Sequence, residues 1–73
     1  MNTNMDLLER NLKSEKLKFI YDEANIIVVT HKNTEVIIED DNSAYIIKDN
    51  QGHEDVAHDE TEVMRILYEI LEL

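Results

Sequence analysis

The chain has 73 residues, no cysteine and a formal net charge of −10 at pH 7. A domain of this size buries only about 60% of the surface that its unfolded chain exposes, and without cysteine it can gain no stability from disulfides or thiolate zinc sites. The excess of carboxylates repels nucleic-acid phosphates, which disfavours direct binding of DNA or RNA.

The acidic charge is concentrated in the second half of the chain. Residues 1–33 contain five basic and five acidic side chains, whereas residues 34–73 contain two basic and twelve acidic ones. The whole net charge therefore belongs to residues 34–73. Abundant Ile, Asn, Lys and Glu, with no Pro, are typical of AT-rich codon usage and indicate a low-GC bacterium or its phage.

The first predicted element is a short helix at residues 4–14. Thr3 or Asn4 can cap it, because both side chains accept hydrogen bonds from the free amides of a first helical turn. Its apolar residues recur at the helical interval and share one face. They are Met5, Leu8 and Leu12.

Four segments rich in β-branched and aromatic residues follow, and polar residues separate them. Lys32 and Asn33 suit a two-residue hairpin turn, because Asn tolerates a positive φ. Short strands joined by tight turns, without crossover helices, predict an antiparallel meander. We expect the strands at residues 16–21, 26–31, 34–39 and 44–48.

The last elements are a polar loop at residues 49–58 and a helix from about residue 60 to the C-terminus. Asp59 is the expected N-cap, with Glu62 at the capping-box position. Apolar residues follow the helical template without a miss, at Val63, Ile66, Leu67, Ile70 and Leu71. Residues 1–73 thus predict a single α+β domain with two layers: an antiparallel sheet of three or four strands, a C-terminal helix and a short N-terminal helix.

The sequence encodes more apolar surface than this fold can cover. The apolar arc of the last helix is about 220° wide, against the roughly 100° that packing on one sheet face requires. The strands are also apolar on both faces, and an exposed apolar patch on a small protein usually marks an interface. We expect a symmetric homodimer; a binding face for a host protein and a monomer that hides more of this surface are the other possibilities. The interface residues we expect are Ile27, Val29, Ile37, Met64, Tyr68 and Leu71.

No group of residues predicts catalysis, a cofactor or a metal. His53 and His58 lie among acidic residues, but their spacing of five does not match ligands on one helical face, which need a spacing of three or four. The acidic run from Glu39 to Asn42 lacks the glycine and spacing of a calcium loop. No glycine-rich phosphate loop or strained nucleophile turn occurs. We therefore expect a protein that is not an enzyme.

The hydropathy pattern predicts a soluble, cytoplasmic protein that does not associate with membranes. The longest unbroken apolar stretch runs from Ile26 to Val29, far short of the roughly 20 residues that span a bilayer. The first ten residues contain no apolar run of signal-peptide length.

The chain resembles the small hypothetical proteins of Bacillus prophages that are grouped as the Yopt family. The resemblance lies in the size, in the β-rich middle from Leu17 to Lys48 and in the C-terminal helix from Asp59 to Leu73. It implies a monomer of about three strands and one helix that forms homodimers and has no assigned biochemical activity. It carries over no functional residues.

Two functions follow from these features. The first is a non-enzymatic, homodimeric accessory protein of a mobile element that binds another protein. The alternative is a DNA mimic, whose carboxylates imitate phosphates and occupy a nucleic-acid-binding host protein. The salt dependence of binding distinguishes the two functions. A mimic binds its partner much more weakly as ionic strength rises, whereas an apolar interface is little affected.

Overall fold

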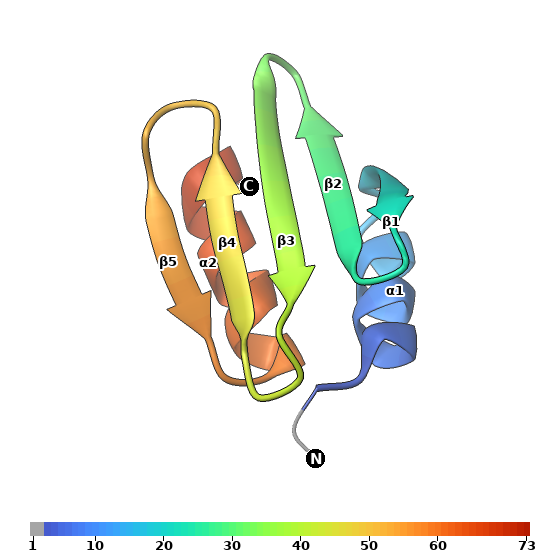
Figure 1. Ribbon diagram of the computed structural model, residues 1–73. Coiled ribbons are helices and arrows are strands. Elements are labelled where there is room, and N and C mark those ends of the chain that lie inside the picture. The colour runs from blue at the N-terminus through green and yellow to red at the C-terminus, as the bar shows by residue number, and fades with distance from the viewer. Residues whose placement is uncertain (1–2) are drawn as a thin grey trace.

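The computed structural model describes residues 3–73 as two helices packed on one face of a five-stranded antiparallel sheet. The strand order follows the chain order, so the sheet is a meander (Figure 1). The predicted two-layer α+β fold is confirmed, but the sheet has five strands rather than three or four. In chain order the elements are α1 (Met5–Ser14), β1 (Lys18–Glu23), β2 (Ile26–His31), β3 (Thr34–Asp40), β4 (Tyr45–Asp49), β5 (Glu54–Ala57) and α2 (Glu60–Leu71).

Both helices begin at the caps that local side-chain chemistry provides. Asn4 caps α1, and its side chain accepts a hydrogen bond from the Leu7 amide at 3.0 Å. Asp59 caps α2 in the same way and accepts from the Glu62 amide at 2.8 Å. The Glu62 carboxylate reaches back to the amide of His58, one residue before the cap, at 2.7 Å. Donors that have no partner inside a helix are thus satisfied at the start of each one.

The segment that we expected to be a polar loop contains the fifth strand. β5 pairs antiparallel with β4, and only Ala57 among its four residues is buried. Its first residues, Glu54 and Asp55, have low β propensity, which explains the missed prediction. An edge strand tolerates them because they remain exposed to water while β4 supplies the backbone partner.

The tight turn between β2 and β3 lies where it was predicted, at Lys32 and Asn33, between the paired residues His31 and Thr34. The positive φ falls on Lys32, at 56°, rather than on Asn33. At the other end of β2, the pairing with β1 is interrupted by a bulge between Tyr21 and Glu23.

The family resemblance implied about three strands and one helix. The structure has two more strands than that pattern and an additional helix, α1.

The core lies between the sheet and the two helices, which stand behind the strands in Figure 1. Alternate residues of β2, β3 and β4 face the helices and are fully buried, because side chains on a strand point to opposite faces in turn. The core side chains are Leu8, Leu12, Leu17, Ile27, Val29, Val36, Ile38, Tyr45, Ile47, Ala57, Val63, Ile66, Leu67 and Leu71. Among residues 3–73, no helix has the length and apolar character that crossing a bilayer requires.

Candidate interaction surface

The face of the sheet that points away from the helices is open, and it carries a contiguous group of apolar side chains. The strand register aligns Ile20 with Val28 and Val28 with Ile37. A second row crosses the sheet from Ile26 through Glu39 and Ile46 to Val56. We call the six apolar residues of these rows the outer patch: Ile20, Ile26, Val28, Ile37, Ile46 and Val56.

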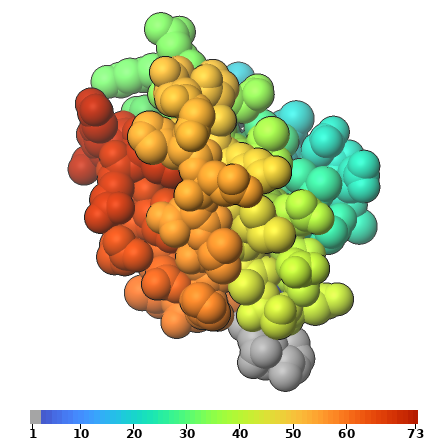
Figure 2. Space-filling view, turned by 60° about the vertical axis from the view of Figure 1, so that its left-hand side comes forward, coloured from blue at the N-terminus to red at the C-terminus, as the bar shows by residue number. Residues whose placement is uncertain are grey.

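The outer patch is accessible to water. Ile20 is 63% exposed, Val56 is 46% exposed and Ile37 is 41% exposed, whereas the other three residues are half-buried by their neighbours in the sheet. Space-filling atoms in Figure 2 show the strands from β5 toward β1 with no helix over them. A contiguous apolar surface of this kind on a small protein usually marks an interaction site.

Charges of both signs lie beside the apolar side chains on this face. The register places four carboxylates beside the outer patch, those of Glu23, Glu35, Glu39 and Glu54. It also places two ammonium groups there, those of Lys18 and Lys48, which gives a formal charge of −2 out of the total of −10. Lys48 lies opposite Ile37 and approaches the Glu54 carboxylate at 3.9 Å. The open face therefore carries two of the ten net negative charges, and its two ammonium groups offset half of its four carboxylates.

Of the six expected interface residues, only Ile37 belongs to the outer patch. Ile27 and Val29 have no exposed surface, because the register turns them toward the helices, and Leu71 is only 6% exposed. These three residues belong to the monomer's own core and cannot contact a second chain while this fold persists.

Met64 and Tyr68 lie in the helical layer. They line a shallow groove of about 240 Å³ between α1 and α2. Tyr68 is 41% exposed, and the neighbouring Glu15 carboxylate, together with desolvation, raises the pKa of the Tyr68 phenol. The expected interface therefore divides between two separate surfaces, one on the sheet and one on the helices.

A buried polar network ties both helices to the sheet. The Asn4 amide donates to the Glu60 carboxylate at 2.7 Å and to the Tyr45 hydroxyl at 3.1 Å, and the Tyr45 hydroxyl donates to Glu60. Burial, and then the hydrogen bond to Glu60, raise the pKa of Tyr45 well above its usual value. Because Tyr45 has no exposed surface and Glu60 is only 8% exposed, this network serves the fold and offers no surface to a substrate.

The histidines of the second half make separate pairs. His53 Nδ1 lies 2.7 Å from Asp49 Oδ2, and His58 Nδ1 lies 3.5 Å from Glu62 Oε1. Within the part of the chain that the structure describes, no three His, Asp or Glu side chains come together as metal ligands.

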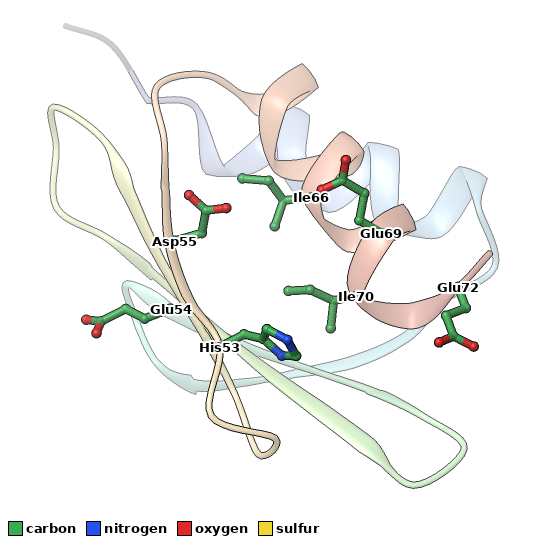
Figure 3. A pocket seen from close by; sticks show the side chains of 7 residues that line it. All are labelled: His53, Glu54, Asp55, Ile66, Glu69, Ile70 and Glu72. Carbon is green, nitrogen blue, oxygen red and sulfur yellow. The ribbon is translucent and has the colours of Figure 1, made fainter.

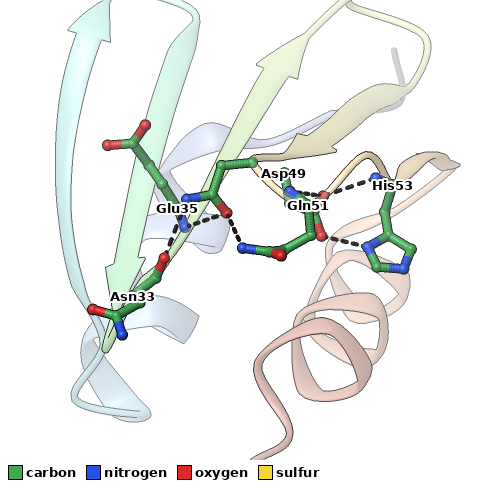
Figure 4. A network of polar contacts seen from close by, with 6 residues as sticks. Asn33, Glu35, Asp49, Gln51 and His53 are labelled. Carbon is green, nitrogen blue, oxygen red and sulfur yellow. Dashed lines mark hydrogen bonds and ion pairs between the residues drawn. The ribbon is translucent and has the colours of Figure 1, made fainter.

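Asp49 organises the loop between β4 and β5 (Figure 4). Its Oδ1 accepts hydrogen bonds from the amides of Gln51 at 2.9 Å and His53 at 2.8 Å. Burial tends to raise the pKa of Asp49, but these bonds and the His53 ring outweigh it and lower that pKa. Asn50 fixes the loop to β3, because its side chain and its amide both bond to Glu35 backbone groups.

Comparison with known proteins gives no relative: no protein family, no curated protein and no solved structure matches the chain. Its function therefore has to be inferred from its own surfaces.

Proposed function

We propose that the protein is a non-enzymatic protein-binding module that acts as a homodimer, and that two copies associate through their outer patches. The observation that supports the proposal is the grouping of six apolar side chains in two neighbouring rows on a sheet face that no other element of residues 3–73 covers. Ile37, at the centre of this face, is the residue shared with the interface expected from the sequence.

A second copy suits this face for two reasons. Two sheets pack face to face about 10 Å apart when both present apolar side chains, as in a β-sandwich, and a two-fold axis brings equal patches together. The ammonium groups of Lys18 and Lys48 offset half of the carboxylates on the outer face, and charges elsewhere on the two copies are largely screened by salt at distances beyond about 10 Å.

The size of the face sets the strength of the expected dimer. Five strands about 4.8 Å apart span roughly 19 Å, and strands of this length extend about 20 Å. Such a face is smaller than the roughly 800 Å² that each partner contributes to a standard stable interface. We therefore expect a reversible dimer with a dissociation constant in the micromolar range.

Ile37 and Tyr68 provide a matched pair of variants, because both are 41% exposed and they lie on different layers. The mass of the wild-type protein in solution, measured by sedimentation equilibrium across dilution, should rise from 8.6 kDa toward twice that value. Ile37→Lys should remain monomeric throughout, whereas Tyr68→Lys should dimerise like the wild type. Circular dichroism checks that both variants are folded.

Three results would contradict the proposal. They are a wild-type monomer at several hundred micromolar, an unaffected Ile37→Lys dimer, or a dimer that only Tyr68→Lys disrupts. Salt gives a further check, because an apolar contact persists when ionic strength rises. A dimer that dissociates steeply as ionic strength rises would contradict an apolar contact.

The biological setting of the proposal follows from the resemblance and the composition. We place the dimer in the cytoplasm of a low-GC bacterium, as an accessory protein of a prophage that binds a host protein. A cysteine-free chain is compatible with that reducing compartment.

A further inference from the structure

The edge of the sheet at β5 has no neighbouring strand among residues 3–73. The Asp49 amide donates to the His53 carbonyl at 3.2 Å, so the ladder with β4 continues through Asp55 and Ala57. In an antiparallel pair, the backbone amide and carbonyl of every second residue point away from the partner strand. In β5 these residues are Glu54 and Val56. The Val56 amide is bonded to the side chain of Asp55 at 2.8 Å, as expected of a group on the free edge. The Glu54 amide and the carbonyls of Glu54 and Val56 remain directed outward.

A groove runs along this edge, between β5 and α2. It has a volume of about 380 Å³, and Ile66 and Ile70 form its apolar floor. Figure 3 shows both isoleucines between the strand and the helix, with Asp55 on the strand side and Glu69 on the helix side. In Figure 2, β5 (orange) is uncovered next to α2 (red). The groove and the strand edge are therefore accessible from the same direction.

The rim of the groove is acidic. The carboxylates of Asp55, Glu69 and Glu72 line it, and His53 is the only basic side chain that does. The Glu69 carboxylate meets Arg65 at 3.3 Å, one turn earlier on the exposed side of α2. A segment that lies in this groove therefore encounters a negative rim above an apolar floor.

We propose that β5 and the groove bind an extended, basic segment of a different protein, which adds to the sheet as a sixth strand. Backbone groups of the segment pair with Glu54 and Val56, and alternate side chains enter the groove over Ile66 and Ile70. Where these alternate side chains are lysine or arginine, their apolar stems lie over the isoleucines and their charged ends meet the acidic rim. Strand addition at an exposed edge, with a neighbouring groove reading alternate side chains, is an established mode of peptide recognition.

The charges of β5 favour a segment of a different protein over a second copy of this chain as the added strand. Two β5 strands side by side would place Glu54 and Asp55 of both chains close together, which disfavours self-pairing at this edge. Asp55 also controls access, because its carboxylate occupies the Val56 amide until an added strand displaces it. The displaced carboxylate then faces the incoming cation. The outer patch remains free for the dimer, so the two contacts do not compete.

The test uses an end-blocked hexapeptide of alternating lysine and valine, with a second peptide that has glutamate in place of lysine. Binding is followed by fluorescence anisotropy, and hydrogen exchange of single amides is followed by NMR. The wild type should bind the lysine peptide and not the glutamate peptide, and binding should slow the exchange of the Glu54 amide. The variant Glu69→Gln should weaken binding about two- to fivefold at low salt.

Two variants at position 54 test whether the outward backbone amide takes part in binding. Glu54→Pro removes the outward amide without breaking the ladder to β4, whereas Glu54→Ala keeps that amide. Proline should weaken lysine-peptide binding more than tenfold and alanine less than threefold. Equal binding by the two variants overturns the proposal, and so does equal binding of the two peptides. If Glu54→Pro does not fold, the wild-type exchange data decide, because an unprotected Glu54 amide in the peptide complex also overturns it.

Discussion

Replacing Tyr45 by phenylalanine tests whether the buried network holds the two layers together. The change removes one hydroxyl and leaves the ring in the core. Glu60 then loses the donor that lies 2.5 Å from its carboxylate and keeps only the Asn4 amide. Because Glu60 is only 8% exposed, water cannot easily replace the missing donor.

The expected loss can be worked out from the type of bond. A hydrogen bond to a charged, buried group contributes about 1.5–3 kcal/mol to the free energy of unfolding, and we take about 2 kcal/mol for Tyr45→Phe. A chain of this length has an unfolding entropy near 0.15 kcal/mol/K, at about 2.1 cal/mol/K per residue. The melting temperature should therefore fall by about 13 °C.

Tyr21 provides the control. Its hydroxyl also donates to a carboxylate, that of Glu9 at 3.0 Å, but on the exposed surface. Tyr21→Phe should change the free energy of unfolding by less than about 0.5 kcal/mol. Both variants are melted by circular dichroism at the same protein concentration, since dimer formation would otherwise shift the comparison. Equal losses for Tyr45→Phe and Tyr21→Phe would refute the assigned role of the network.

Four further variants test the loop, a cap and the core. The lowered pKa of Asp49 means that its carboxylate stabilises the fold above its unfolded pKa, near 3.8, and loses this effect as pH falls through the folded pKa. The difference between the urea midpoints of the wild type and Asp49→Asn should thus shrink below pH 4, and a difference independent of pH would contradict the assignment. Asp59→Ala should cost about 1 kcal/mol in thermal unfolding, while Asp59→Asn, which can still cap α2, should cost much less. Leu67→Ala should cost about 2–5 kcal/mol in urea unfolding, because the side chain is fully buried; a loss below about 1 kcal/mol would contradict the packing.

The helices and most strands could be predicted because their signals are local. Asp59 and Glu62 mark the start of α2, and the apolar interval along α2 continues to Leu71, where the helix ends. The β-branched run from Ile26 to Thr30 favours an extended backbone over the whole length of β2. For these elements the side chains of a short segment carry enough free-energy preference to decide its conformation.

The face of each strand was harder to assign, although a weak signal exists. Ile37 shares its alternation with Glu35 and Glu39, and Val28 shares its alternation with Thr30. These polar residues indicate that their face of the strand points to solvent. Ile27 and Val29, which lie on the opposite face, therefore belong in the core. The interface prediction missed this signal because apolar residues occupy both faces of β2.

Cap chemistry and apolar spacing, both contained within single segments, thus determined where α1, α2 and β2 to β4 form, whereas β1 begins and ends two residues later than predicted. Tertiary structure alone decided the rest. Glu54 and Asp55 became a strand because β4 supplied a backbone partner, and Glu60 became buried because Tyr45 and Asn4 met it from two other elements. The separation of Ile37 from Tyr68 also depends on the layers. Each of these outcomes depends on contacts between residues far apart in the chain, whose free energy no local pattern contains.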